Sequence, residues 1–149
     1  MLRIVMFELL QLAVSWFAIR RGGAPERMVG WMLLIAALTS LAMGVPGNAF
    51  RGLTWLHFGI DLTLFLGLLG IALRANRFWP YWMAAFELLA IGVHGARAFD
   101  PTFVPIVYSR LTGQVAYPMC LVLVLGTYHY TRRARLEGVA PKPWATLRW

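Results

Sequence analysis

Residues 53–73 read LTWLHFGIDLTLFLGLLGIAL and are followed at 74–77 by RANR, and this stretch decides the predicted fold. It is almost wholly apolar over the ~20 residues that a helix rising ~1.5 Å per residue needs to cross a bilayer. Four other runs have the same character, and each ends at Gly, Pro or Arg residues typical of helix ends. The sequence predicts five membrane-spanning helices, over residues 2–19, 28–45, 53–73, 78–99 and 112–130.

The composition favours the same fold. Of the 149 residues, 60% are hydrophobic and 13% are charged, whereas soluble domains average ~45–50% apolar and ~25% charged residues. The single cysteine, Cys120, excludes an internal disulfide and a thiolate metal cluster. Because the connections between the runs are short, we predict an all-α integral membrane protein built as an antiparallel five-helix bundle.

The distribution of basic residues predicts an orientation. With the N-terminus outside, ten of the 14 Lys and Arg residues fall in the inner loops and the tail, and the other four lie outside. Positive charge collects in short cytoplasmic loops, so we expect the N-terminus outside and the C-terminus in the cytoplasm of a bacterial inner membrane. The same bias explains the net charge of +8 without a nucleic-acid partner.

Two further segments complete the predicted organisation. Residues 101–110 are apolar but too short to cross a bilayer and contain two prolines, so we expect a short interfacial segment before the last helix. Residues 1–135 then form the transmembrane bundle, and residues 136–149 form a basic and aromatic cytosolic tail.

Polar residues within the apolar runs are the candidate site. Ionisable groups at bilayer depth are costly and therefore point to function. Spacings of three, four and seven residues place these polar groups on one face of each helix, and their estimated depths all fall in the outer half of the bundle. The predicted pocket comprises Glu8, Gln11, His57, Asp61, Glu87, His94 and, at the rim, Arg97.

Three interpretations of these residues remain open. They can be interhelical hydrogen bonds that only hold helices together. His57 and His94, at equal estimated depth, can be the axial ligands of a b-type haem. Together with Asp61 and Glu87, they can also bind a divalent metal or relay protons or ions.

The predicted function is binding rather than catalysis. No nucleophile elbow, phosphate loop or paired catalytic motif is present, so we assign no catalytic residue. We expect a small accessory or binding subunit of a membrane complex, with a polar pocket in its outer half. The alternative is a haem- or metal-binding redox protein, or an ion- or proton-handling one. The expected partners are the lipid bilayer and other membrane subunits or a second copy, and no nucleic acid.

Overall fold

The computed structural model describes residues 2–43, 55–99, 105–138, 142 and 144, and side chains within 5–39, 41–42, 58–96, 114–138, 142 and 144. The described residues form five helices: α1 (Leu2–Arg21), α2 (Ala24–Met43), α3 (Trp55–Arg74), α4 (Trp79–Phe99) and α5 (Pro105–Glu137). The predicted all-helical bundle of five helices is therefore confirmed for the described residues.

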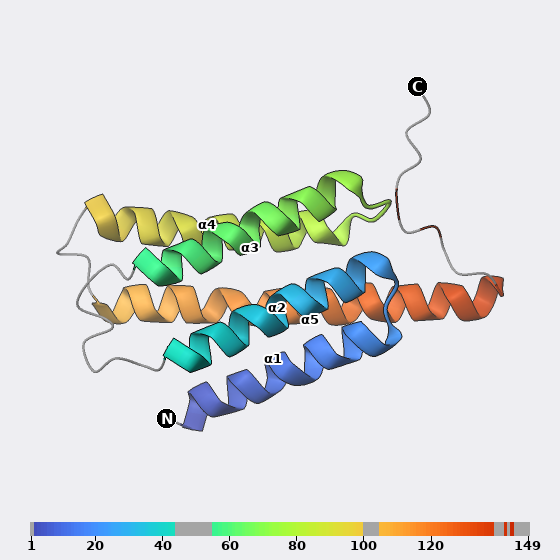
Figure 1. Ribbon diagram of the computed structural model, residues 1–149, viewed down its shortest axis with the longest axis horizontal. Coiled ribbons are helices and arrows are strands. Elements are labelled where there is room, and N and C mark those ends of the chain that lie inside the picture. The colour runs from blue at the N-terminus through green and yellow to red at the C-terminus, as the bar shows by residue number, and fades with distance from the viewer. Residues whose placement is uncertain (1, 44–54, 100–104, 139–141, 143, 145–149) are drawn as a thin grey trace.

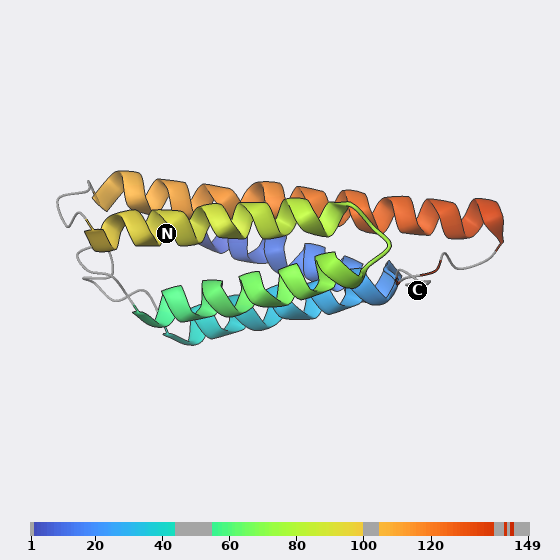
Figure 2. The same cartoon turned by 90° about the horizontal axis from the view of Figure 1, so that it is seen from above.

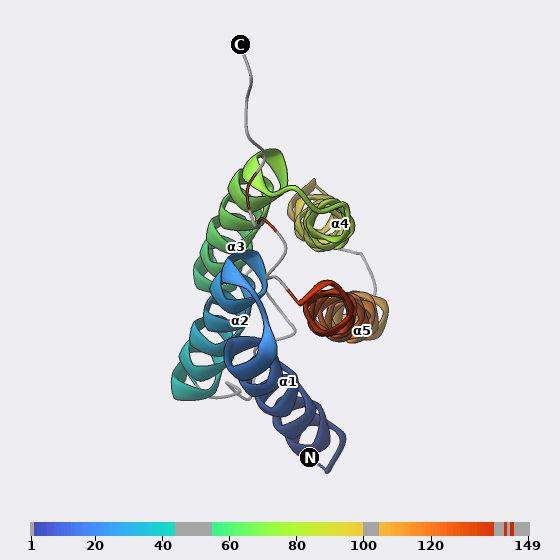
Figure 3. The same ribbon diagram turned by 90° about the vertical axis from the view of Figure 1, so that its right-hand side faces the viewer.

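The helices run alternately up and down the long axis of the molecule (Figure 1). Each helix packs against its neighbours in sequence, α1 and α5 also pack together, and α2 contacts α5 across the middle. Seen along the long axis, α1, α2 and α3 form one curved layer, and α4 and α5 cover its inner side (Figure 3). A view from above shows α5 extending beyond the other helices at its C-terminal end (Figure 2). This arrangement encloses an interior that all five helices can reach.

The turn between α1 and α2 is tight because it contains two glycines. The Gly22 N–H donates to the Ala18 carbonyl at 2.8 Å, and the Arg27 N–H donates to the Gly23 carbonyl at 2.9 Å. A Cβ at Gly22 would collide with Glu26 and with the Ala18 carbonyl, and one at Gly23 would collide with the Tyr130 ring. The absence of these side chains lets α1 and α2 reverse direction within two residues.

The core draws on every helix. Ala18, Val29, Leu68, Met83 and Leu123 come from α1 to α5 in turn, and each is fully buried. Burying a large apolar side chain contributes about 1.5–3 kcal/mol. The central layer of the bundle is thus an ordinary packed hydrophobic core.

The last helix differs from its prediction. Instead of a separate interfacial segment followed by a helix over 112–130, α5 begins at Pro105 and continues to Glu137. Proline is compatible with the first turn of a helix, because the N–H groups there make no hydrogen bond within the helix and proline has none to lose. The predicted interfacial segment is therefore wrong from residue 105 onward, and residues 101–104 lie outside the described residues.

The predicted tail over 136–149 is described at only a few positions. α5 extends two residues into it, and Trp144 makes an isolated antiparallel bridge with Ala75 in the turn between α3 and α4. This part of the tail therefore returns to the bundle.

The membrane prediction is contradicted. Within the part of the chain that the structure describes, no helix combines the length and the apolarity needed to cross a bilayer. Polar groups such as Glu8, Asp61 and Glu87 interrupt the apolar runs. This finding overturns the five membrane spans, together with the inner-membrane location and the orientation derived from them. The described helices nevertheless expose large apolar side chains, among them Leu9, Trp31, Leu66, Leu88 and Leu121.

Candidate functional site

A cavity of about 180 Å³ lies between the helices, and all five helices contribute polar and apolar side chains to its wall. α1 supplies Glu8 and Gln11, α3 supplies Asp61, and α4 supplies Glu87. Small residues make room for it, because alanines occupy lining positions on α2, α4 and α5. Four of the seven residues predicted for the pocket therefore line one space.

Glu87 and Asp61 are the central acid pair of this cavity. Glu87 is only 4% exposed. Burial, and secondarily the nearby charge of Asp61, raises the pKa of the Glu87 carboxyl to about 8. The Glu87 carboxyl is therefore mostly protonated at neutral pH and can both donate and accept a hydrogen bond.

His94 connects to this pair from α4. Its Nε2 lies 2.8 Å from Asp61 Oδ2, and its ring packs edge-on against Phe58 at 6.1 Å between centroids. An imidazole N–H that donates to a carboxylate holds the carboxylate in place. The polar faces predicted for residues 53–73 and 78–99 thus meet through Asp61 and His94.

The two polar residues from α1 play different roles. Gln11 Nε2 donates to the Leu33 carbonyl on α2 at 3.1 Å, which ties the two helices together. Glu8 Oε2 is buried and has no hydrogen-bond partner among the described residues, and burial raises the pKa of the Glu8 carboxyl. Glu8 therefore offers the cavity an unsatisfied polar oxygen.

The thiol of Cys120 also lines the cavity. Burial raises the pKa of Cys120 to about 11, so the thiol stays protonated at neutral pH. Because the thiolate is the nucleophile and the metal ligand, Cys120 acts here as a small packing residue.

The metal-binding interpretation needs correction. Among the described side chains, no group of three or more His, Cys, Asp or Glu residues is arranged to hold a metal ion. The His94 nitrogen that faces Asp61 is already engaged with it at 2.8 Å. His57 and Arg97 belong to α3 and α4, but their side chains lie outside the described residues, as does any haem ligand pair that includes His57.

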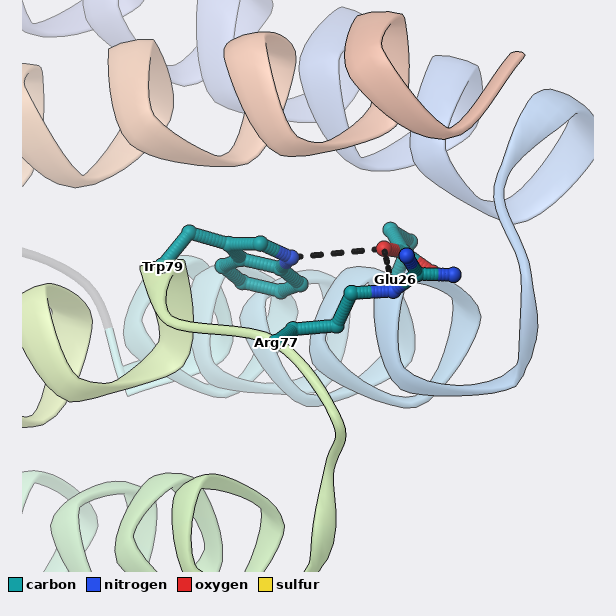
Figure 4. Close-up of polar contacts among 3 residues, drawn as sticks. All are labelled: Glu26, Arg77 and Trp79. Carbon is teal, nitrogen blue, oxygen red and sulfur yellow. Dashed lines mark hydrogen bonds and ion pairs between the residues drawn. The ribbon is translucent and has the colours of Figure 1, made fainter. Parts of the chain in front are cut away.

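A second polar cluster was not identified from the sequence. Glu26, at the start of α2, is fully buried and accepts a hydrogen bond from Trp79 Nε1 at 3.3 Å (Figure 4). Arg77, in the turn before α4, brings its Nε to 3.9 Å from the same oxygen. Two features of the sequence could have pointed to Glu26. It is one of only six acidic residues, and an apolar run begins two residues after it.

The cavity brings together ionisable and hydrogen-bonding side chains from α1, α3, α4 and α5. Its described lining contains three carboxyl groups, one amide and one thiol, and no Lys, Arg or His. Comparisons of this chain with models of protein families, with curated proteins and with solved structures found no match.

Proposed function

We propose that this protein binds a small organic cation in its core cavity, in exchange for a proton on Glu87. The supporting observation is that Glu8, Asp61 and Glu87, from three different helices, line a single cavity without a basic residue in its described lining. This proposal keeps the binding role predicted from the sequence and gives it a ligand class.

The charge of the cavity favours a cation. Burial of Glu87 and repulsion from the partly exposed Asp61, which His94 contacts at 2.8 Å, together raise the pKa of Glu87. A ligand ammonium between Asp61 and Glu87 would replace the proton on Glu87 and stabilise both carboxylates. Its N–H groups would also supply the hydrogen-bond donor that Glu8 Oε2 lacks.

The cavity size limits the ligand. A volume of about 180 Å³ corresponds to about six water molecules at the ~30 Å³ that each occupies in the liquid. Short alkylammonium ions fit this space. A ligand with three non-hydrogen atoms reaches an affinity of about millimolar at best.

Binding should depend on pH because a proton leaves as the cation enters. Below pH 8 the ligand must displace the proton from Glu87, so affinity rises about tenfold per pH unit up to the Glu87 pKa and then levels off. NMR titration of the protein with ethylammonium at pH values from 6 to 9 measures this slope. Ethanol, a neutral ligand of the same size, should bind more weakly at every pH.

Matched variants make the test specific. Glu87→Gln keeps the shape and neutral charge of the protonated side chain, so it should fold normally and lose the pH dependence. Glu137→Gln removes an exposed carboxyl outside the cavity and should behave as the unmodified protein does. Equal binding of ethanol and ethylammonium, or a slope unchanged in Glu87→Gln, would contradict the proposal.

A further inference from the structure

A larger hollow of about 640 Å³ lies between the start of α4 and the C-terminal half of α5, apart from the core cavity. Its walls are aromatic and include Phe78, Trp79, Trp82 and Phe86. Pockets of about 300–1,000 Å³ with mainly apolar walls and few polar groups are typical of small-molecule sites. The volume and lining of this hollow fall within that range.

The charged side chains that line this hollow are basic, whereas Glu26 lies behind the wall, 3.9 Å from Arg77 Nε. Arg77 and Arg133 line it together with His129, and no acidic residue is among its described lining. Arg133 is exposed, whereas the side chain of Arg77 is 10% exposed. The hollow thus combines a solvent-exposed arginine with a largely buried one in its wall.

The wall beside Arg77 is held in place before any ligand arrives. Trp79 donates to Glu26, and its indole packs so closely against Gly126 that a Cβ there would lie 3.0 Å from the ring. The Arg77 guanidinium lies 5.6 Å from the centre of the Tyr130 ring. Arg77 Nη2 is nevertheless buried without a hydrogen-bond acceptor among the described residues, which is a costly state for a charged donor.

We propose that this hollow binds an aromatic carboxylate, with its ring between the aromatic walls and its carboxylate toward Arg77 and Arg133. A guanidinium matches the planar geometry of a carboxylate and can donate two parallel hydrogen bonds to it. Offset and edge-on packing against Trp79 and Trp82 favours a flat ring over an alkyl chain. The exposed Arg133 guanidinium can reach such a carboxylate directly, and the buried Arg77 adds electrostatic attraction through the wall.

Titration calorimetry with 2-naphthoate tests this assignment in the 149-residue chain. A ligand of this size should bind with a Kd of about ten to a hundred micromolar. The neutral analogue 2-naphthamide has the same ring and should bind at least about tenfold more weakly, because it cannot accept charge-assisted hydrogen bonds.

Two pairs of variants separate the charge from the ring contribution. Arg133→Gln should weaken naphthoate binding about tenfold, whereas Arg132→Gln changes the neighbouring exposed arginine, which does not line the hollow, and should leave binding unchanged. Trp82→Ala should also weaken binding about tenfold. Trp31→Ala, which removes an equally exposed indole from α2, should not.

Three results would overturn the inference. These are the absence of saturable naphthoate binding, equal affinity for naphthoate and naphthamide, and an equal effect of Arg132→Gln and Arg133→Gln. All four variants change exposed side chains, so circular dichroism should show a native helix content in each and leave the binding result interpretable.

Discussion

Glu87 determines how the charge of the core cavity changes with pH, because its carboxyl loses its proton near neutral pH. Its pKa of about 8 in the folded protein lies above the ordinary value of 4.5. The folded state therefore binds this proton more tightly than the unfolded state does. The pKa shift on which the proposed cation exchange depends also links the protonation of Glu87 to stability.

We predict that the protein loses stability as the pH rises from about 5 to 8. Between the unfolded and folded pKa values of Glu87, the folded state holds more protons, so the free energy of unfolding falls with pH, in total by on the order of a few kcal/mol. Urea unfolding at several pH values measures this decline. Glu87→Gln should flatten most of it, and a smaller slope from Glu8, whose pKa is also raised, should remain. An identical slope in Glu87→Gln would contradict the link.

The sequence anticipated part of the site at this scale. Helical spacing placed Asp61 on one predicted face and Glu87 with His94 on another, and the structure joins these faces by the hydrogen bond between Asp61 and His94. Periodicity assigns a residue to a face but does not give the rotation of one helix against another. It could not show that Gln11 would bond to the α2 backbone while Glu8 faces the cavity.

At the scale of the helices, close packing of α1 on α2 depends on Gly30. A Cβ at this position would lie 3.0 Å from the Ser15 carbonyl and 3.3 Å from Ala18 Cβ, both on α1. The backbone carbonyl cannot move without displacing the helix. Gly70 on α3 offers the contrast, because a Cβ there would meet nothing within 4 Å.

This contrast predicts opposite effects for two glycine-to-alanine changes. Gly30→Ala should destabilise the protein by about 1–3 kcal/mol, because it forces α1 and α2 apart. Gly70→Ala should raise stability by up to about 1 kcal/mol, because alanine has the higher helix propensity. Thermal or urea unfolding of both variants measures the difference. Similar effects in the two would mean that α1 and α2 can adjust at their contact.

The bounds of the helices also show what a pattern can and cannot predict. Gly22, Gly23 and the turn at 74–77 marked helix ends correctly, because glycine and short polar sequences interrupt a helix by local geometry. Pro105 was interpreted as part of an interfacial segment, yet it opens α5. Proline is compatible with both structures, and only packing along α4 decides between them.

For the whole molecule, the apolar runs predicted five helices correctly, whereas the membrane-spanning character inferred from the same runs is contradicted. A hydrophobic content of 60% counts apolar residues over the whole chain, but crossing a bilayer requires a run of about 20 consecutive, predominantly apolar residues within one helix. The described helices do not provide one. Composition also says nothing of how apolar residues divide between core and surface, and many of them lie outside the core here.

Glu26, Arg77 and Trp79 join the start of α2 to the turn before α4 and to the start of α4. We predict that Glu26 and Arg77 act as a unit. Glu26→Gln should cost about 3 kcal/mol, because it leaves the buried Arg77 without its charge partner. Arg77→Met should cost a similar amount for the reciprocal reason. In the double variant the two losses should fall short of their sum by about 1–3 kcal/mol. Strictly additive losses in urea unfolding would show that the two charges act separately.

All five helices line the core cavity. Filling it with a larger side chain tests whether the space is empty in the folded protein and whether the ligand binds there. Ala90 lines the cavity, whereas Ala72 is fully buried in packed core and does not. Ala72→Leu should cost about 1–3 kcal/mol through overpacking, and Ala90→Leu should cost less because space is available for the larger side chain. Ala90→Leu should also abolish ethylammonium binding, since the added carbons occupy the ligand's space. Urea unfolding combined with the NMR titration measures both effects, and equal destabilisation with unchanged binding would show that the ligand lies elsewhere.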